Sequence, residues 1–293
     1  MAHYSIWMLE YSHCLTQPMG CIFYGQWNEG TRPFPYSYVY LEGEGHKILV
    51  DVGHDDDGTN ERLSKRYDVI DWQPPEAVLS KIGVRPDDID TVILTHVHYD
   101  HAGGARRFPN ATFYLQRKDL EGAKWALENR HLFESIIGAI DPSDIAMLDE
   151  FAEQGRLRLL DGDLELFPGL SIRLAEDTHT FGSQYVLVET DGEPWVITGD
   201  NLYSYENAEG INQDGVPVSI GFGGGSCWNT LTAIHDMHVA AGDSNRLVIA
   251  HEGATFDRHP SHLYPDGLAV AELTLAPGVD SRLNGLTQFT PTQ

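Results

Sequence analysis

The segment Thr95-His96-Val97-His98-Tyr99-Asp100-His101 contains three imidazoles and one carboxylate within six residues. The apolar, β-branched run before it, Thr91-Val92-Ile93-Leu94, is typical of a buried strand. The residues after it, Ala102-Gly103-Gly104, are typical of a loop. We therefore expect the polar groups on a turn at the end of a core strand. Imidazole and carboxylate groups are ligands of zinc and of related divalent metals, so the segment predicts a metal site.

Further residues of the ligand type follow later predicted strands. His179 follows a strand expected at 170–175, Asp200 follows the apolar run 194–198, and His251 follows the run 246–250. Loops at the ends of rigid strands can converge on one site, so these three residues are further candidate ligands. Each of them alone would also fit a purely structural role, as a hydrogen-bonded loop histidine or a turn residue.

The composition excludes several classes of function. The chain has 293 residues and a formal net charge of −25, which argues against nucleic acid and membrane surfaces because both require a basic patch. The same charge disfavours a highly anionic substrate. No apolar run approaches the roughly 18 residues of a membrane span, and no secretory signal pattern is visible. The three cysteines match no zinc-finger spacing, and we expect a cytoplasmic protein.

Strands and helices alternate along the chain from residue 36 onward, with short connections between them. This pattern predicts an α/β protein with two sheets and helices outside them. We expect one domain over residues 1–293, with an irregular, aromatic-rich segment at 1–35 and a helical insertion at 117–155 near the pocket. The elements expected are a hairpin at 36–51, helices at 74–82 and 228–241, and strands at 91–95, 111–115, 156–160, 170–175, 184–190, 194–198 and 246–250.

The order His96-x-His98-x-Asp100-His101, then His179, Asp200 and His251, resembles the metallo-β-lactamase superfamily. The resemblance implies an αββα sandwich of two mixed β-sheets flanked by helices. It also implies two divalent metal ions, zinc in the first place, with manganese, iron or cobalt as alternatives. His96, His98 and His179 would bind one ion. Asp100, His101 and His251 would bind the other, with Asp200 bridging both.

Within that superfamily the chain looks most like the N-acyl homoserine lactonases, the quorum-quenching enzymes. Tyr203 stands three residues after Asp200, as in those lactonases, and Tyr99 lies inside the histidine cluster. The segment Thr178-His179-Thr180-Phe181-Gly182-Ser183 departs from their usual pattern, because a glycine before His179 and a second histidine at position 183 are missing. This departure leaves the identity of the lactone open.

The resemblance implies a hydrolase that opens a small neutral lactone by attack of a metal-bridging hydroxide. Tyr203 would stabilise the developing oxyanion, and Asp100 would pass a proton to the leaving oxygen. Tyr99 and Phe222, the latter in a glycine-rich loop at 221–225 expected to be flexible, are candidate substrate contacts. A homodimer is the expectation from the family.

Other functions share this ligand set. A cyclic amide, another ester or a glyoxalase-II-like thioester would be open to the same hydrolysis. From different classes, a diiron redox protein uses the same scaffold, and a non-catalytic binding module is the remaining alternative. His54 follows the Asp51-Val52-Gly53 turn and is undecided, whereas His259 and His262 are expected to be structural because the set of seven ligands is already complete.

Overall fold

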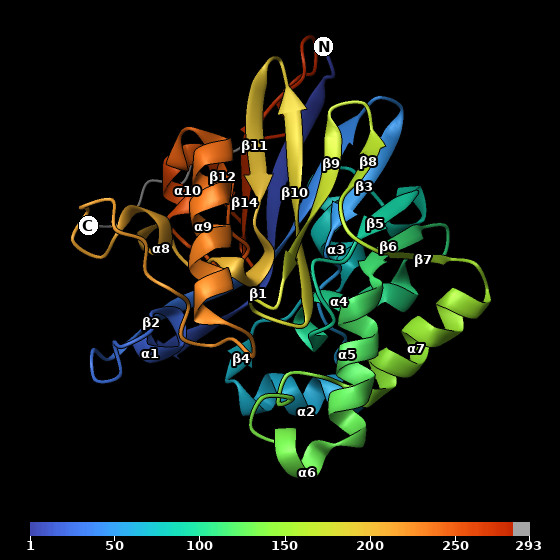
Figure 1. Cartoon of the computed structure of the whole chain (residues 1–293). Helices are drawn as coiled ribbons and strands as arrows, with labels where there is room; N and C mark the ends of the chain where they lie inside the picture. The colour runs from blue at the N-terminus through green and yellow to red at the C-terminus, as the bar shows by residue number, and fades with distance from the viewer. Residues whose placement is uncertain (284–293) are drawn as a thin grey trace.

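Two β-sheets pack face to face, and helices cover both outer faces (Figure 1). This computed structural model describes residues 1–283. The large sheet has the strand order β13-β14-β1-β2-β3-β5-β6-β7, with β4 paired to β1, and the small sheet has the order β12-β11-β10-β9-β8. Both sheets mix parallel and antiparallel pairs. The predicted αββα sandwich is confirmed.

The strands of the large sheet are β1 (Tyr4–Pro18), β2 (Thr31–Gly43), β3 (His46–Val50), β4 (Val69–Ile70), β5 (Thr91–Ile93), β6 (Thr112–Gln116), β7 (Leu157–Leu160), β13 (Ser261–Leu263) and β14 (Ala269–Thr274). Those of the small sheet are β8 (Leu164–Phe167), β9 (Leu170–Glu176), β10 (Gly182–Thr190), β11 (Glu193–Ile197) and β12 (Leu247–Val248).

The α-helices are α1 (Met19–Ile22), α2 (Gly58–Arg66), α3 (Pro75–Ser80), α4 (Tyr99–Ala102), α5 (Arg117–Glu128), α6 (Arg130–Phe133), α7 (Pro142–Glu153), α8 (Tyr205–Glu209), α9 (Cys227–Ala241) and α10 (Thr255–Arg258). Short 3₁₀ turns are η1 (Pro86–Asp88), η2 (Gly103–Arg107), η3 (Gly199–Asn201) and η4 (Ser244–Arg246). None of the described helices is long and apolar enough to cross a lipid bilayer.

Three apolar layers hold the sandwich together. The layer between the sheets contains Ile6 and Val50 of the large sheet packed with Val186 of the small sheet. One outer layer lies between the large sheet and the helices α3, α5 and α7, and the other lies between the small sheet and α9. Each sheet is therefore apolar on both of its faces, which makes the strands rigid supports for the loops at their ends.

The prediction of an irregular segment at 1–35 is wrong, because residues 4–18 form β1 between β14 and β2. Successive side chains point into different layers: Ile6 and Met8 pack between the sheets, whereas Trp7 and Leu9 pack toward the helices. A strand that is buried on both faces has nearly continuous apolar runs, such as residues 6–9 here. The polar–apolar alternation that reveals a half-buried strand is therefore missing here.

The loop expected after the histidine cluster is also different in the structure. Residues 99–102 form one helical turn, α4, which continues into the 3₁₀ turn η2 at Gly103. Gly104 lies against the backbone of Val52, where a Cβ atom would approach the carbonyl oxygen of that residue to 2.4 Å. The glycines therefore permit close packing of this helical turn rather than an open loop.

Candidate metal centre

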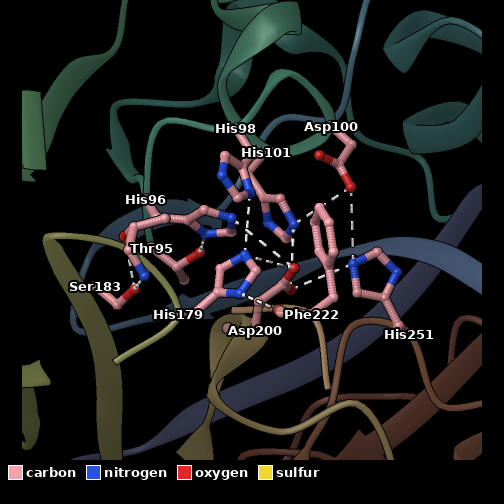
Figure 2. Close-up of polar contacts among 12 residues, drawn as sticks. Thr95, His96, His98, Asp100, His101, His179, Ser183, Asp200, Phe222 and His251 are labelled. Atoms are coloured by element: carbon pink, nitrogen blue, oxygen red, sulfur yellow. Dashed lines mark hydrogen bonds and ion pairs between the residues drawn. The ribbon is translucent and has the colours of Figure 1, made fainter. Parts of the chain in front are cut away.

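Seven side chains from both sheets converge on one point at the ends of their strands (Figure 2). They are His96 and His98 after β5, Asp100 and His101 on α4, His179 between β9 and β10, Asp200 on η3 after β11, and His251 after β12. The large sheet thus contributes the histidine cluster, and the small sheet contributes the three single residues. All seven residues predicted as ligands are brought together.

Asp200 lies at the centre of the group. Its Oδ1 is 3.2 Å from Nε2 of both His101 and His251. Its Oδ2 is 3.4 Å from His179 Nε2 and 3.8 Å from His96 Nε2. One oxygen therefore faces each of two groups of imidazoles, the arrangement that a carboxylate needs to bridge two cations.

Several nitrogen atoms in the group are buried without a hydrogen-bond partner of suitable geometry. These are Nε2 of His96, His101 and His251. His98 Nδ1 and His179 Nε2 face each other at 3.0 Å. Buried polar atoms are normally hydrogen-bonded, so several such nitrogens in one small space fit a cation-binding site. Imidazole nitrogens and carboxylate oxygens at this spacing fit divalent cations such as zinc.

Outer partners hold the imidazole rings in place. Asp51 Oδ2 accepts a hydrogen bond from His101 Nδ1 at 2.8 Å and another from Thr95 Oγ1 at 2.8 Å. His179 Nδ1 donates to the Phe222 carbonyl at 2.9 Å, and His251 Nδ1 donates to the Pro35 carbonyl at 2.8 Å. A donor hydrogen on Nδ1 leaves Nε2 free as a ligand atom, which is how outer contacts orient metal-binding histidines.

Burial and neighbouring charges set the protonation of the site. Burial lowers the pKa of His96 and His98 well below the usual histidine value, and it lowers the pKa of His179 to about 4. At His101 burial is outweighed by the nearby carboxylates, Asp200 first, which raise the pKa well above its usual value. The charge of His101 in turn helps to hold the pKa of Asp200 well below its usual value, against the effect of burial. Neutral His96, His98 and His179 beside an ionised Asp200 are the protonation states that a divalent cation requires.

A cavity of about 280 Å³ opens beside this group and is lined by Asp100, Asp200, His98 and His251. Tyr203 also lines it, and its hydroxyl donates to the Phe222 carbonyl at 3.2 Å. Burial, followed by the charges of Asp200 and Asp100, raises the pKa of Tyr203 well above its usual value. The tyrosine therefore keeps its proton and remains a hydrogen-bond donor at the cavity wall.

The candidate substrate contacts Tyr99 and Phe222 also lie in the wall of this cavity. The loop that carries Phe222 is tied down by its backbone: Phe222 N donates to Cys21 O at 2.8 Å and Gly224 N donates to His179 O at 2.9 Å. At Gly225 a Cβ atom would approach the Thr178 carbonyl oxygen to 2.3 Å. The glycines thus allow the loop to pair with the turn that carries His179.

Position 183, where the lactonases have a second histidine, has a structural role here. Ser183 Oγ accepts a hydrogen bond from Thr180 N at 3.0 Å and lies 2.7 Å from Thr180 Oγ1. The serine therefore closes the turn that follows His179. His54 does not line the cavity; its Nδ1 donates to the Asp55 carbonyl at 2.8 Å.

Sequence reasoning missed two residues that bear on the site. Asp119 is buried on α5 and accepts hydrogen bonds from Val97 N at 2.8 Å and Gly182 N at 2.9 Å. Arg66, at the end of α2, lines the cavity. Neither residue lies in a recognisable motif, so no signal in the sequence pointed to them. Of the predicted insertion at 117–155, Ala139 is the part that reaches the cavity wall in the described chain.

The model of the metallo-beta-lactamase superfamily matches residues 31–250, which is most of the chain. The chain belongs to this superfamily. Its members share the two-sheet fold found here, and the histidine cluster and the three later ligand-type residues all lie within the matched region or directly beside it.

Two similar curated proteins are N-acyl homoserine lactonases, from Bacillus sp. and from Bacillus cereus. Each is 30% identical to this chain over 179 residues, which is 58% of this chain. The aligned region spans only 64% of the length of each relative. The likeness therefore covers only part of each chain, and the activity of these relatives is a basis for a proposal.

Solved structures give the same fold. A quorum-quenching N-acyl homoserine lactone lactonase superposes with a TM-score of 0.63 at 21% identity, covering 87% of this chain and 95% of that one. A dizinc quorum-quenching lactonase in complex with a product homoserine superposes with a TM-score of 0.63 at 16% identity, covering 90% and 89%. At this level of identity the superposition establishes the fold alone.

Proposed function

We propose that this protein is a dinuclear-metal hydrolase that opens the ring of a small lactone. One observation carries the proposal: seven histidine and aspartate side chains meet with buried, unpartnered nitrogens beside a cavity that also presents the Tyr203 hydroxyl. The likeness to N-acyl homoserine lactonases supports a lactone as the substrate class. The part of the substrate that reaches the metal centre would be the neutral ring.

The residues divide into two cation sites around Asp200. His96, His98 and His179 form one group of donors, and Asp100, His101 and His251 form the other. We propose zinc for both, because imidazole-rich sites suit it, and manganese, iron or cobalt would suit the site that holds Asp100. When bound, the two cations supply an acidified water as nucleophile and a Lewis acid for the ester carbonyl.

Two side chains of the cavity act on the substrate. The Tyr203 hydroxyl donates a hydrogen bond to the carbonyl oxygen as negative charge develops on it, which stabilises the transition state more than the ground state. Asp100 Oδ2 lies 3.6 Å from His101 Nε2 and 3.8 Å from His251 Nε2. From this position Asp100 would take a proton from the attacking water and pass it to the leaving ring oxygen.

Two further expectations belong to this proposal. A cytoplasmic location is consistent with three free cysteines in the described chain, because thiols persist in a reducing compartment. A single domain and a homodimer are proposed from the family likeness. Size-exclusion chromatography with light scattering measures the number of subunits directly.

Hydrolysis of a lactone panel by zinc-loaded protein tests the function. The panel holds N-hexanoyl and N-decanoyl homoserine lactones, γ-butyrolactone, δ-valerolactone and dihydrocoumarin, with a lactam and S-lactoylglutathione as rival substrates. Proton release is followed, and bound metal is counted by elemental analysis. We expect turnover of one lactone class with two metals per chain. Turnover of the lactam or thioester alone, or none with two metals bound, would refute the lactonase proposal.

A matched pair of variants tests the metal centre itself. His179→Gln removes one of the donors, whereas His235→Gln removes an exposed histidine of α9. We expect the first variant to bind less zinc and to lose turnover, and the second to behave like the wild type. Equal zinc content in the two variants would show that His179 is not a ligand.

A further inference from the structure

One positively charged side chain, that of Arg66, lies in the wall of the cavity beside the metal centre, where Asp68, Asp100 and Asp200 are acidic. Arg66 ends α2, and its exposed side chain lines the same cavity as Asp100 and Asp200. Its guanidinium carbon lies 5.6 Å from the centre of the Tyr67 ring, which also lines the cavity. In residues 1–283 no carboxylate lies within ion-pairing distance of Arg66.

This lack of a partner is unusual for the chain. Acidic residues outnumber basic ones by 44 to 19, so most cations have a carboxylate partner nearby. Arg107, for example, pairs with both Asp55 and Glu76. Asp68 lines the same cavity as Arg66 but forms no ion pair with it in the described structure. The charge of Arg66 is therefore available to an anion from outside the protein.

The nearby acid on the neighbouring helix is already engaged. Glu134 accepts hydrogen bonds from Arg130 Nε at 2.9 Å and from Arg130 Nη2 at 3.1 Å, and this pairing, more than the charge of Arg66, lowers the pKa of Glu134. Arg62 lines the adjoining cavity together with Arg66, Arg130 and Glu134, and it donates to Thr59 Oγ1 at 2.8 Å. The adjoining cavity is therefore lined by three guanidinium groups and one carboxylate, so the side of Arg66 that faces away from Asp100 and Asp200 is locally positive.

The Tyr67 hydroxyl and the Arg66 guanidinium lie beside one another next to Gly138. A methyl group at position 138 would lie 3.1 Å from the Tyr67 hydroxyl, which is a tight contact. It would lie 3.5 Å and 3.6 Å from Nη1 and Nη2 of Arg66, which are ordinary van der Waals distances. Both donor groups are thus close to one point in space, where they can serve one acceptor of planar shape.

We propose that Arg66 binds a carboxylate on the substituent of the substrate, so that the substrate is a lactone with an anionic tail. A guanidinium binds a carboxylate through two parallel hydrogen bonds, which a neutral acyl chain cannot make. The lactone ring and the carboxylate would share one cavity of about 280 Å³, so the tail would be short. This inference rests on the lactonase function proposed above, with Arg66 determining specificity at a distance from the reacting bond.

The test compares two lactones of equal chain length. N-hexanoyl homoserine lactone ends in a methyl group, and N-adipoyl homoserine lactone ends in a carboxylate. Both are assayed with zinc-loaded wild type, with Arg66→Gln and with Lys65→Gln. Lys65 is the matched control, because it precedes Arg66 on α2, is exposed, pairs with Glu61 and lines neither cavity.

We expect the wild type to favour the adipoyl lactone by about ten-fold in kcat/KM, mainly through a lower KM. Arg66→Gln should abolish this preference, and Lys65→Gln should keep it. Hydrolysis of both lactones by the wild type with no preference for the acid would overturn the inference and leave the proposed function intact. So would an equal loss of preference in the two variants.

If zinc-loaded wild type hydrolyses neither of these lactones and none of the lactones in the panel above, the proposed function fails. If it hydrolyses another lactone of the panel, the proposed function stands. In both cases binding decides the role of Arg66 separately. Calorimetry measures the affinity of wild type and Arg66→Gln for the ring-opened diacid N-adipoyl homoserine. Binding that is about ten-fold weaker in the variant supports anion recognition by Arg66. Equal affinity, or no binding to either protein, refutes it.

Discussion

Substitution of Asp119 is expected to weaken metal binding, although this residue does not itself face the metal centre. Its carboxylate is fully buried and holds two backbone segments: Oδ2 accepts from Val97 N, and Oδ1 accepts from Gly182 N. Val97 stands between His96 and His98, and Gly182 follows the turn of His179. One side chain therefore links the loop from the large sheet to the loop from the small sheet.

The magnitude follows from two opposing effects. Asp119→Ala leaves two buried N–H groups without acceptors, at about 1–3 kcal/mol each. Burial raises the pKa of the Asp119 carboxyl to about 6. Removing this carboxylate therefore removes the unfavourable burial of its charge, which offsets about 3 kcal/mol at neutral pH. The expected net change in the free energy of unfolding is therefore small, between a gain of about 1 kcal/mol and a loss of about 3 kcal/mol. The two N–H groups that lose their acceptor belong to the loops that carry the candidate ligands. Loss of such outer contacts typically weakens metal affinity about 10- to 100-fold.

The assay is competition for zinc against a chromophoric chelator, combined with urea unfolding of the metal-free protein. Asp149→Asn is the matched control, because it removes a carboxylate of α7 that pairs with Lys124, outside the site. We expect weaker zinc binding in the Asp119 variant and unchanged binding in the control. A zinc affinity for Asp119→Ala within about two-fold of the wild type would refute the argument that this carboxylate positions the ligands.

Three further outcomes are expected. Tyr203→Phe should lower kcat by up to about 10²–10³ with its zinc content unchanged, since it removes one donor to the oxyanion; steady-state kinetics with unaltered kcat would disprove that role. Burial, and then Asp141, raises the pKa of Asp144 to about 7, so the folded state keeps a proton that the unfolded state releases. The stabilising contribution of protonated Asp144 is complete below about pH 4 and is lost as the pH rises through 7. The free energy of unfolding falls over this range by no more than about 1.4 kcal/mol per pH unit. In Asp144→Asn, urea unfolding at several pH values should show a free energy of unfolding that depends less on pH. Removal of metal by a chelator should lower the unfolding free energy by about 4 kcal/mol relative to protein at a thousand-fold excess of zinc over its Kd, and unchanged unfolding curves would contradict a metal centre.

The sequence alone determined the family of the fold and the set of ligand-type residues. His96, His98, Asp100 and His101 are close in the chain, so their proximity in space follows from local geometry. His179, Asp200 and His251 were recognised because each follows a predicted strand, and strand ends are where a sandwich presents its loops. The strand at 36–41 was predicted from its aromatic and β-branched alternation, although the structure buries it on both faces.

Other features depended on contacts that are distant in the chain. β1 was missed because burial on both faces removes its alternation, and only its pairing with β2 and β14 defines it as a strand. Asp119 and Arg66 are ordinary helical residues in the sequence. Asp119 contacts Gly182, 63 positions away, and the role proposed for Arg66 depends on the cavity that it shares with Asp100 and Asp200. Local patterns encode which residues are able to bind a metal, whereas the tertiary packing of α2 and α5 against the loops decides how those ligands are held and which substrate the cavity accepts.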